Sequence, residues 1–297
     1  SAARFRTSRL QENDKSYLLE FHKLMDDEPF VRQCLGTKVA TDYPGIAFIF
    51  GFPRSGTTLL ENVLDTQSLL QVLPERPALF FVKQAISGEL GYEYPQELKK
   101  LTQDDRQFLR DLYFKKVQEL GFELDSMGMV VDKGPHHTID LPLIRLLFPR
   151  ARLILSLRHP LDVVLSCFQQ DFELNQNTRM LFALDDIVKR YTQVFSLYEV
   201  YVNKLQLEVL EVKYEKLVTD FDQQIDAVFQ FLGIRPVENF RDYQFRSVKK
   251  FIQSSSRGQA DQPIYASSVG RWKNYESYLK PCIPDLMHFC ERFSYDT

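Results

Sequence analysis

A glycine-framed turn near the start of the chain carries an arginine, a serine and two threonines, and this arrangement could bind a phosphate group. The apolar run over residues 46–50 leads directly into this turn, and a helical pattern over residues 59–64 follows it. A glycine-rich turn between a strand and a helix exposes backbone N–H groups, and the amino end of the helix adds its dipole. We therefore expect five consecutive residues to bind a phosphate of a nucleotide: Arg54, Ser55, Gly56, Thr57 and Thr58.

The spacing of Gly51 and Gly56 is that of a P-loop, but Thr57 stands where a P-loop carries its lysine. That lysine reaches the β- and γ-phosphates of a nucleoside triphosphate, and the next residue holds Mg²⁺. Its replacement argues against an ATP or GTP hydrolase. A P-loop kinase-like phosphotransferase and a non-catalytic nucleotide-binding module remain as alternatives.

A second candidate site follows the apolar run over residues 153–157. Arg158 stands at the end of this run, Pro160 opens a helix, and Ser166 lies eight residues after the arginine, about two helical turns along. Ligands of α/β sheets bind at the carboxyl ends of the strands, so we expect Arg158 near a ligand. The alternatives are a surface ion pair with Asp162 and, for Ser166, a small residue at a helix contact.

Transfer of an anionic group also needs a base and a cation at the reacting atoms. Lys133 follows the apolar residues 129–131, again at a strand end, and Glu75 lies beyond the first helix. His136 and His137 compete with Glu75 as the base, since histidine needs no change of pKa to act near neutral pH. The alternatives are solvated side chains, with Glu75 beside Arg76 and Lys133 beside Asp132.

The segment over residues 254–272 is rich in Ser, Gly and Gln, which is typical of a loop. Tyr265 and Trp272, the only tryptophan, indicate that this loop packs on the protein. Residues 246–273 contain six basic side chains and one acidic side chain, so the segment is positively charged. We expect it to close over an anionic ligand and exclude water.

The string Pro53–Thr58 resembles the 5′-phosphosulfate loop of sulfotransferases that use 3′-phosphoadenylyl sulfate (PAPS), including tyrosylprotein sulfotransferases and bacterial sulfotransferases found with tetratricopeptide repeats. The likeness extends over residues 45–275 and includes the Arg158 and Ser166 pair. It implies transfer of a sulfuryl group from PAPS to an acceptor hydroxyl of a protein tyrosine, a sugar or a small alcohol. The other product is 3′,5′-adenosine bisphosphate (PAP). PAPS has no γ-phosphate, so a loop without the lysine suits it, and the resemblance implies no metal.

The resemblance also implies individual roles. Glu75 would be the catalytic base, Lys133 would contact the sulfonate and its bridging oxygen, and Ser256 would assist catalysis. Arg158 and Ser166 would bind the 3′-phosphate, while Tyr214 and Arg271 would contact the donor nucleotide, Arg271 in place of the usual lysine. Two positions depart from the tyrosylprotein enzymes: Pro74 replaces a glycine, and Gln170 replaces an arginine.

The elements that must position these residues alternate between strands and helices. We expect strands over residues 46–50, 129–131 and 153–157, an edge strand over 207–212, and helices over 59–64, 161–168 and 221–232, with a helical region over 95–122. This pattern predicts an α/β fold: a P-loop NTPase-like parallel sheet flanked by helices on both faces, the sulfotransferase fold. Residues 1–42 are expected to form a helical N-terminal extension, and residues 43–297 the sulfotransferase domain.

Composition excludes several classes. The 37 Lys and Arg residues against 40 Asp and Glu residues give a net charge of −3, which argues against a nucleic-acid binder. No apolar run approaches the roughly 20 residues that cross a bilayer. The four cysteines are scattered, so we expect reduced thiols, no metal site and a cytoplasmic protein, or a Golgi luminal one if an anchor has been removed. The acceptor pocket is expected near Phe80, Phe81 and residues 95–122 and 172–182. A homodimer and an upstream repeat domain stay open.

Overall fold

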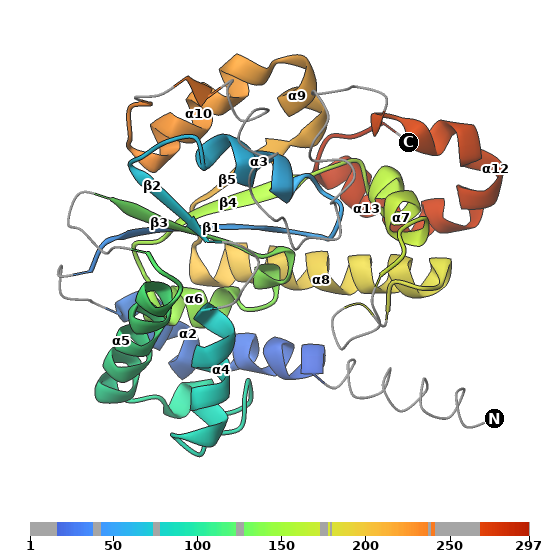
Figure 1. The fold of residues 1–297 in the computed structure, drawn as a ribbon. Coiled ribbons are helices and arrows are strands. Elements are labelled where there is room, and N and C mark those ends of the chain that lie inside the picture. The colour runs from blue at the N-terminus through green and yellow to red at the C-terminus, as the bar shows by residue number, and fades with distance from the viewer. Residues whose placement is uncertain are drawn as a thin grey trace.

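The computed structural model describes residues 17–37, 43–73, 78–122, 128–172, 178, 180–236, 239–240 and 268–296. At its centre is a five-stranded parallel sheet of order β2-β3-β1-β4-β5 (Figure 1). The strands are β1 Gly45–Gly51, β2 Leu70–Leu73, β3 Met129–Lys133, β4 Arg152–Leu157 and β5 Val209–Lys213. This arrangement confirms the predicted parallel sheet and the four predicted strands, with β5 at an edge.

Strand β2 was not predicted. Its sequence, Leu70-Gln71-Val72-Leu73, is only four residues long and contains a polar residue, so it lacks the continuous apolar run of a central strand. It pairs with β3 alone, through the register Leu70 to Met129 and Leu73 to Asp132. An edge strand needs fewer apolar residues, which explains why the pattern escaped detection.

Helices cover both faces of the sheet (Figure 1). The helices on one face are α3 Thr57–Leu64, α9 Tyr214–Thr219 and α10 Phe221–Leu232. The other face is covered by a helix over residues 17–26 and by α2 Glu28–Gly36, α4 Ala78–Gly88, α5 Gln103–Glu119, α6 Leu141–Leu147 and α8 Leu184–Leu205. Beyond the sheet lie α7 Pro160–Phe168, α12 Glu276–Leu279 and α13 Ile283–Arg292.

Each face of the sheet has its own hydrophobic core, because successive side chains of a strand point to opposite faces. Phe48 and Phe50 of β1 pack in the core under α8, while Ala47 and Ile49 pack in the core under α3 and α10. Strand β3 alternates in the same way, so that Asp132 and Lys133 point to opposite faces. The parallel register brings Lys133 opposite Ile49, near the carboxyl end of β1.

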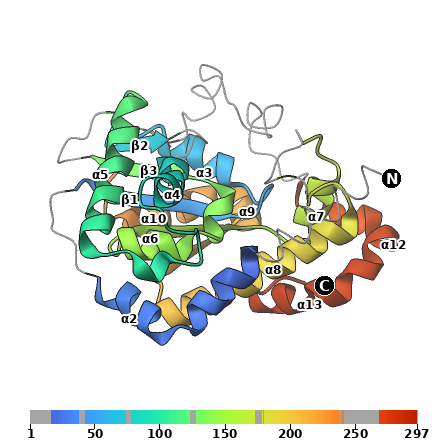
Figure 2. The same cartoon turned by 90° about the horizontal axis from the view of Figure 1, so that it is seen from below.

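The long helix α8 runs along one face, beside the helix over residues 17–26 and α13 (Figure 2). The N-terminal helix contributes Leu18, Phe21, Leu24 and Met25 to the same core as α8. Within the described parts of the chain, no helix has both the length and the apolar character needed to cross a membrane.

Candidate active site

The phosphate loop connects β1 to α3 through two residues in the left-handed backbone region. Arg54 has φ 72°, and Gly56, which caps α3, has φ 101°. A Cβ atom on Gly56 would lie 2.8 Å from Cδ2 of Tyr214, and one on Gly51 would lie 2.5 Å from the Ser156 carbonyl oxygen. Both glycines are therefore required by close approach. Ser55, which lies between them, is buried, as are Thr57 and Thr58 at the start of α3.

Side chains from three other elements hold this loop in place. Ser156 of β4 donates through Oγ to the Ser55 carbonyl oxygen at 2.9 Å, and Thr138 donates to the Gly51 carbonyl oxygen at 2.6 Å. The Cys167 thiol of α7 lies 3.4 Å from the Pro53 carbonyl oxygen. These contacts order the loop before a ligand binds, which lowers the entropic cost of binding.

Arg158, at the carboxyl end of β4, lies against this loop. Its Nη1 donates to the Arg54 carbonyl oxygen at 3.3 Å, and its guanidinium carbon lies 5.1 Å from the centre of the Tyr214 ring. Its Nη2 donates to the Ser268 carbonyl oxygen at 2.6 Å. The alternative for Arg158, a surface ion pair with Asp162, is not found: Asp162 accepts from the backbone N–H groups of Gly270 and Trp272.

Ser166 lies on α7 and contacts the Arg54 side chain. Its Oγ accepts from Arg54 Nε at 3.1 Å. The fold brings together three residues that are far apart in the sequence: Arg54 of the loop, Arg158 at the end of β4 and Ser166 of α7. The Tyr214 ring packs between Arg158 and Gly56. Arg271, which is exposed, donates to Gln169 Oε1 at 3.2 Å, at the end of the same helix α7.

Lys133 lies on the other side of the loop, at the end of β3. Its side chain has no exposed surface, and its Nζ lies 2.8 Å from Oε2 of Glu61 on α3. The alternative of a solvated lysine beside Asp132 is excluded, because the Lys133 side chain is fully buried and pairs with Glu61 on the opposite face of β3 from Asp132. Glu61 was not predicted as a site residue, since only the packing of α3 on β3 makes the contact.

The two histidines after Lys133 have different environments. His137 is buried with its Nε2 3.0 Å from Asp132 Oδ1, and Tyr113 donates to the other oxygen of Asp132 at 2.8 Å. Gly134 permits this packing, because a Cβ atom there would lie 2.7 Å from the His137 ring. His136 is partly exposed and contributes to a cavity. Burial, followed by the nearby charges of Arg190 and Lys83, lowers the pKa of His136 to about 4.

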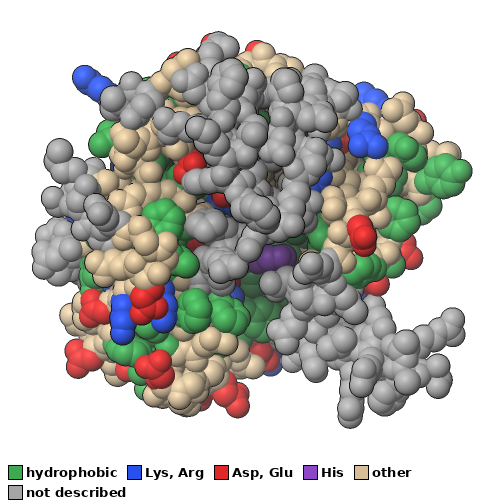
Figure 3. Space-filling model, viewed as in Figure 1, with side chains coloured by type: hydrophobic (Ala, Val, Ile, Leu, Met, Phe, Trp, Pro, Cys, Tyr) green, Lys and Arg blue, Asp and Glu red, His purple; other side chains and the backbone are tan. Residues whose placement is uncertain are grey.

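Two predicted catalytic residues, Glu75 and Ser256, lie outside the described residues. Phe80 and Phe81 of the expected acceptor region are exposed on α4, where hydrophobic side chains reach the surface over α4 and α5 (Figure 3). In the described ranges no group of three or more His, Cys, Asp and Glu side chains could hold a metal ion.

The sequence model of the sulfotransferase family matches residues 45–239, which include the whole sheet, the phosphate loop, Lys133, Arg158 and Ser166. The chain belongs to the sulfotransferase family. The chain is 30% identical over 247 residues to an uncharacterized protein of Aquifex aeolicus (strain VF5), and the match covers 80% of the chain and 32% of that relative.

A second relative is the nodulation protein NoeE of Sinorhizobium fredii (strain NBRC 101917 / NGR234), 25% identical over 232 residues, or 65% of this chain and 51% of that protein. The chain thus spans about a third of the length of one curated relative and half of the other.

The solved structure of the sulfotransferase domain from the curacin biosynthetic pathway has the same fold. It superimposes with a TM-score of 0.58 at 22% identity, and the match covers 85% of this chain and 98% of that domain. The likeness identifies the parallel sheet with its flanking helices as the P-loop-like sulfotransferase fold.

Proposed function

We propose that this sulfotransferase moves the sulfuryl group of PAPS to an acceptor hydroxyl and releases PAP. The observation that carries the proposal is the meeting of Arg54, Arg158 and Ser166, from three separate elements, beside a phosphate loop without the lysine of a nucleoside triphosphatase. Two guanidinium groups next to a glycine turn suit a donor with separate 5′ and 3′ phosphates.

The chemistry of the donor side supports this assignment. Arg158 Nε and Ser55 Oγ are buried polar atoms that have no hydrogen-bond partner among the described residues. Buried polar atoms nearly always have a hydrogen-bond partner. Both groups are therefore suited to donate a hydrogen bond to an anionic ligand. Tyr214, whose ring lies between Gly56 and Arg158, would pack against the nucleotide. Arg271 would add charge from the C-terminal segment, which here means the described residues 268–296.

In the proposed reaction the acceptor oxygen attacks the sulfur atom in line with the bond to the 5′-phosphate. A new oxygen–sulfur bond forms, the old one breaks, PAP leaves with the electron pair, and the acceptor proton passes to a base. We assign the base to Glu75, with Lys133 and Ser256 stabilising the transferred group. His137 is a poor candidate because it is buried against Asp132 on the opposite side of β3 from Lys133.

Calorimetric titration with PAP and with ATP–Mg²⁺ tests the donor. We expect tight binding of PAP only, and we expect Arg158→Ala to weaken PAP roughly 10- to 100-fold, since a hydrogen bond to a charged group contributes about 1.5–3 kcal/mol. Arg152→Ala is the matched control, because Arg152 is an exposed arginine at the opposite end of the same strand. Preference for ATP–Mg²⁺, or an equal loss in both variants, would refute the proposed donor site.

Turnover of labelled PAPS tests the base. Glu75→Ala is expected to abolish transfer while PAP binds as before. Activity that survives in Glu75→Ala and disappears in His136→Ala would move the role to the histidine. PAP binding without turnover of any hydroxyl would favour a non-catalytic nucleotide-binding module.

A further inference from the structure

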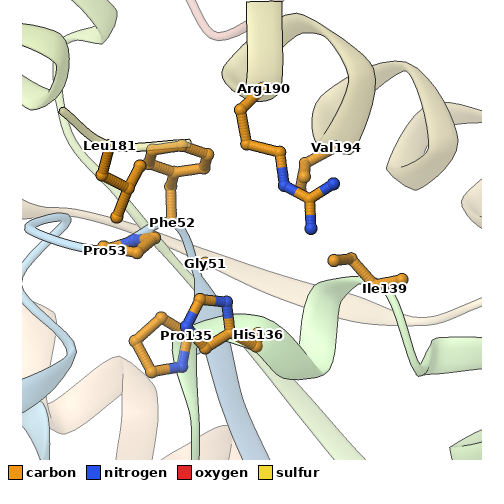
Figure 4. Close-up of a pocket in the computed structure, with 9 residues that line it drawn as sticks. All are labelled: Gly51, Phe52, Pro53, Pro135, His136, Ile139, Leu181, Arg190 and Val194. Atoms are coloured by element: carbon orange, nitrogen blue, oxygen red, sulfur yellow. The ribbon is translucent and has the colours of Figure 1, made fainter. Parts of the chain in front are cut away.

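The structure has a small hollow beside the phosphate loop and a larger cavity at the opposite edge of the sheet. The small hollow is lined in part by Phe52, His136 and Arg190 of α8, and its volume is about 10 Å³ (Figure 4). Such a space holds at most one water molecule, so it cannot take an organic ligand. The larger cavity has a volume of about 430 Å³, which is in the range of ligand pockets.

The larger cavity lies where β4 begins. Its wall comes from the end of α6 and its connection to β4, from the turn between α8 and β5, and from Phe231 of α10. Because α6 and α8 lie on one face of the sheet and α10 on the other, the cavity spans the edge of the sheet (Figure 1). Arg152 lines it at the start of β4, whereas Arg158 of the donor site follows the end of that strand. The rise of the strand places the two arginines about 20 Å apart.

Positive charge is concentrated in this cavity. Arg145, Arg150 and Arg152 line it together with one acidic residue, Glu208, which leaves an excess of two positive charges in a protein whose net charge is −3. The ion pairs within the described parts of the chain include none of these four residues. The Cys34 thiol near Arg145 provides no counter-charge, because burial raises its pKa to about 12.

Arg145 has hydrogen-bonding capacity that the protein does not use. Its Nη1 donates to the Pro149 carbonyl oxygen at 2.6 Å, which holds the guanidinium at the connection to β4. Its Nε is buried and has no hydrogen-bond partner among the described residues. Buried N–H groups are nearly always paired in native proteins, so this side chain is suited to a ligand that accepts hydrogen bonds.

Much of the remaining wall is apolar. Phe148, Leu153 and Leu207 are buried residues of the wall, and Phe231 is partly buried. The Arg152 guanidinium carbon lies 5.5 Å from the centre of the Phe231 ring, so this arginine and this ring form one side of the cavity together. The cavity therefore offers an organic group an apolar surface next to the guanidinium groups.

We propose that this cavity binds a small phosphate monoester, with the phosphate between Arg145 and Arg150 and the organic group on the apolar wall. The planar donors of a guanidinium match two oxygens of a phosphate, and a dianion balances the excess of two positive charges. A long polyanion is disfavoured by the negative net charge of the protein. The site is separate from the donor site, so the inference does not depend on the proposed function.

Calorimetry with phenyl phosphate tests the site, in the absence and in the presence of one equivalent of PAP. We expect one phenyl phosphate to bind per chain, with the same affinity in both titrations. Inorganic phosphate lacks the organic group and benzenesulfonate has a single charge, so each should bind at least about fivefold more weakly. Absence of binding, competition by PAP, or equal affinity for the three probes would overturn the proposal. If PAP itself does not bind, the donor proposal fails and the titration without PAP still decides this one.

Variants assign the binding to the arginines. Arg150→Gln changes an exposed side chain, so the variant should fold normally, and we expect it to weaken phenyl phosphate roughly tenfold. Glu208→Gln should strengthen binding about twofold, because it removes a repelling charge. Arg32→Gln, at an exposed position of α2, is the matched control and should bind as the wild type does. Unchanged affinity in Arg150→Gln, or an equal loss in Arg32→Gln, would contradict the assignment.

A lipid could present the same phosphate, and sedimentation with vesicles separates the two sources. Phosphatidic acid in phosphatidylcholine vesicles carries a phosphate monoester at a membrane surface. We expect the protein to stay in the supernatant, because its negative net charge opposes approach to an anionic bilayer. Cosedimentation that Arg150→Gln abolishes, without binding of phenyl phosphate, would overturn the choice of a small soluble ligand.

Discussion

The Lys133 side chain is fully buried, and its ammonium group forms an ion pair with the Glu61 carboxylate at 2.8 Å. Removing one member of a buried ion pair leaves an uncompensated charge, which costs about 3–5 kcal/mol. We expect Glu61→Ala to lower the free energy of unfolding by this amount and Glu61→Gln/Lys133→Met to recover much of it, as measured by urea denaturation. Glu119→Ala breaks the exposed pair with Lys116 and should cost under about 1 kcal/mol. Equal effects of Glu61→Ala and Glu119→Ala would show that the buried pair adds no stability.

The lowered pKa of His136 makes stability depend on pH. The folded protein keeps this histidine neutral down to about pH 4, whereas the unfolded chain protonates it near its ordinary pKa of 6.5. The unfolded chain therefore binds more protons than the folded protein between about pH 4 and 6.5. The free energy of unfolding keeps its full value with respect to this group above pH 6.5 and decreases as the pH falls toward 4. Burial of His159 lowers its pKa as well and acts in the same direction. We expect the free energy of unfolding to fall less steeply between pH 7 and 4 in His136→Gln than in the wild type, and equal slopes would contradict the assignment.

Among individual residues of the site, those that follow strand ends could be predicted from the sequence, and those placed by helix packing could not. Arg54 and Arg158 each follow a strand of a parallel sheet, so their approach could be expected from the strand order alone. Glu61 and Arg190 lie on helices whose rotation about their own axes is set by tertiary contacts. A glutamate four residues after Thr57 on the helix that follows a phosphate loop is the signal that could have suggested the first of them.

At the scale of elements, α7 joins the donor site to the C-terminal segment. Asp162, in the first turn of α7, accepts from the Gly270 N–H at 2.7 Å and from the Trp272 N–H at 2.9 Å, and Trp272 stacks on His159 with ring centres 5.1 Å apart. The same segment supplies the Ser268 carbonyl oxygen to Arg158. The C-terminal segment and the proposed 3′-phosphate site therefore form one packed unit.

We expect Asp162→Ala to destabilise the protein by about 2–4 kcal/mol, since two backbone N–H groups lose a charged acceptor. The affinity for PAP should fall in the same variant, because Arg158 loses the support of the segment. Asp185→Ala is the matched control, an exposed acid in the first turn of α8. Thermal unfolding and PAP titration measure both effects. Unchanged PAP affinity in a destabilised Asp162→Ala would separate the segment from the donor site.

The elements differed in how well their patterns predicted them. Strands β1 and β4 are continuous apolar runs because helices cover both of their faces, and the sequence predicted them within one or two residues. Strand β2 escaped because it is short and lies at an edge. The 22-residue helix α8, which carries Arg190 and packs on one face of the sheet, was also not predicted. Its large aromatic side chains pack on three different parts of the protein: Tyr198 contacts Phe50 of β1, Tyr191 contacts Phe52 of the phosphate loop, and Phe195 contacts Phe289 of α13. No motif marks these residues.

At the scale of the whole molecule, the helix over residues 17–26 packs into the main core. Phe21 is buried and contacts the rings of Tyr17, Tyr94 and Tyr201, with centre distances of 5.4, 6.0 and 6.3 Å. Lys204 of α8 donates to the Met25 carbonyl oxygen and to Asp26, each at 2.8 Å. These contacts lead us to expect that the N-terminal helix folds with the sheet as one unit.

Phe21→Ala should then lower the free energy of unfolding by about 3–5 kcal/mol, the usual cost of removing a buried aromatic side chain. Leu19→Ala, on the exposed side of the same helix at 52% exposure, should change it by less than about 0.5 kcal/mol. A single denaturation transition followed by both tyrosine fluorescence and circular dichroism would match one cooperative unit. A separate early transition that Phe21→Ala alone shifts would show an independent extension.

The four cysteines are all buried, and this has a practical consequence for studying the protein in solution. Burial raises the pKa of Cys34 and Cys167 to about 12 and that of Cys290 to about 11, and it raises the pKa of Cys282 as well. Only the thiolate reacts with maleimides, so the native thiols are nearly inert at neutral pH. A cysteine placed at Tyr278, which is 76% exposed on α12, would therefore take a fluorescent dye selectively on the wild-type background. The labelled protein could then follow the C-terminal segment during donor binding, one molecule at a time.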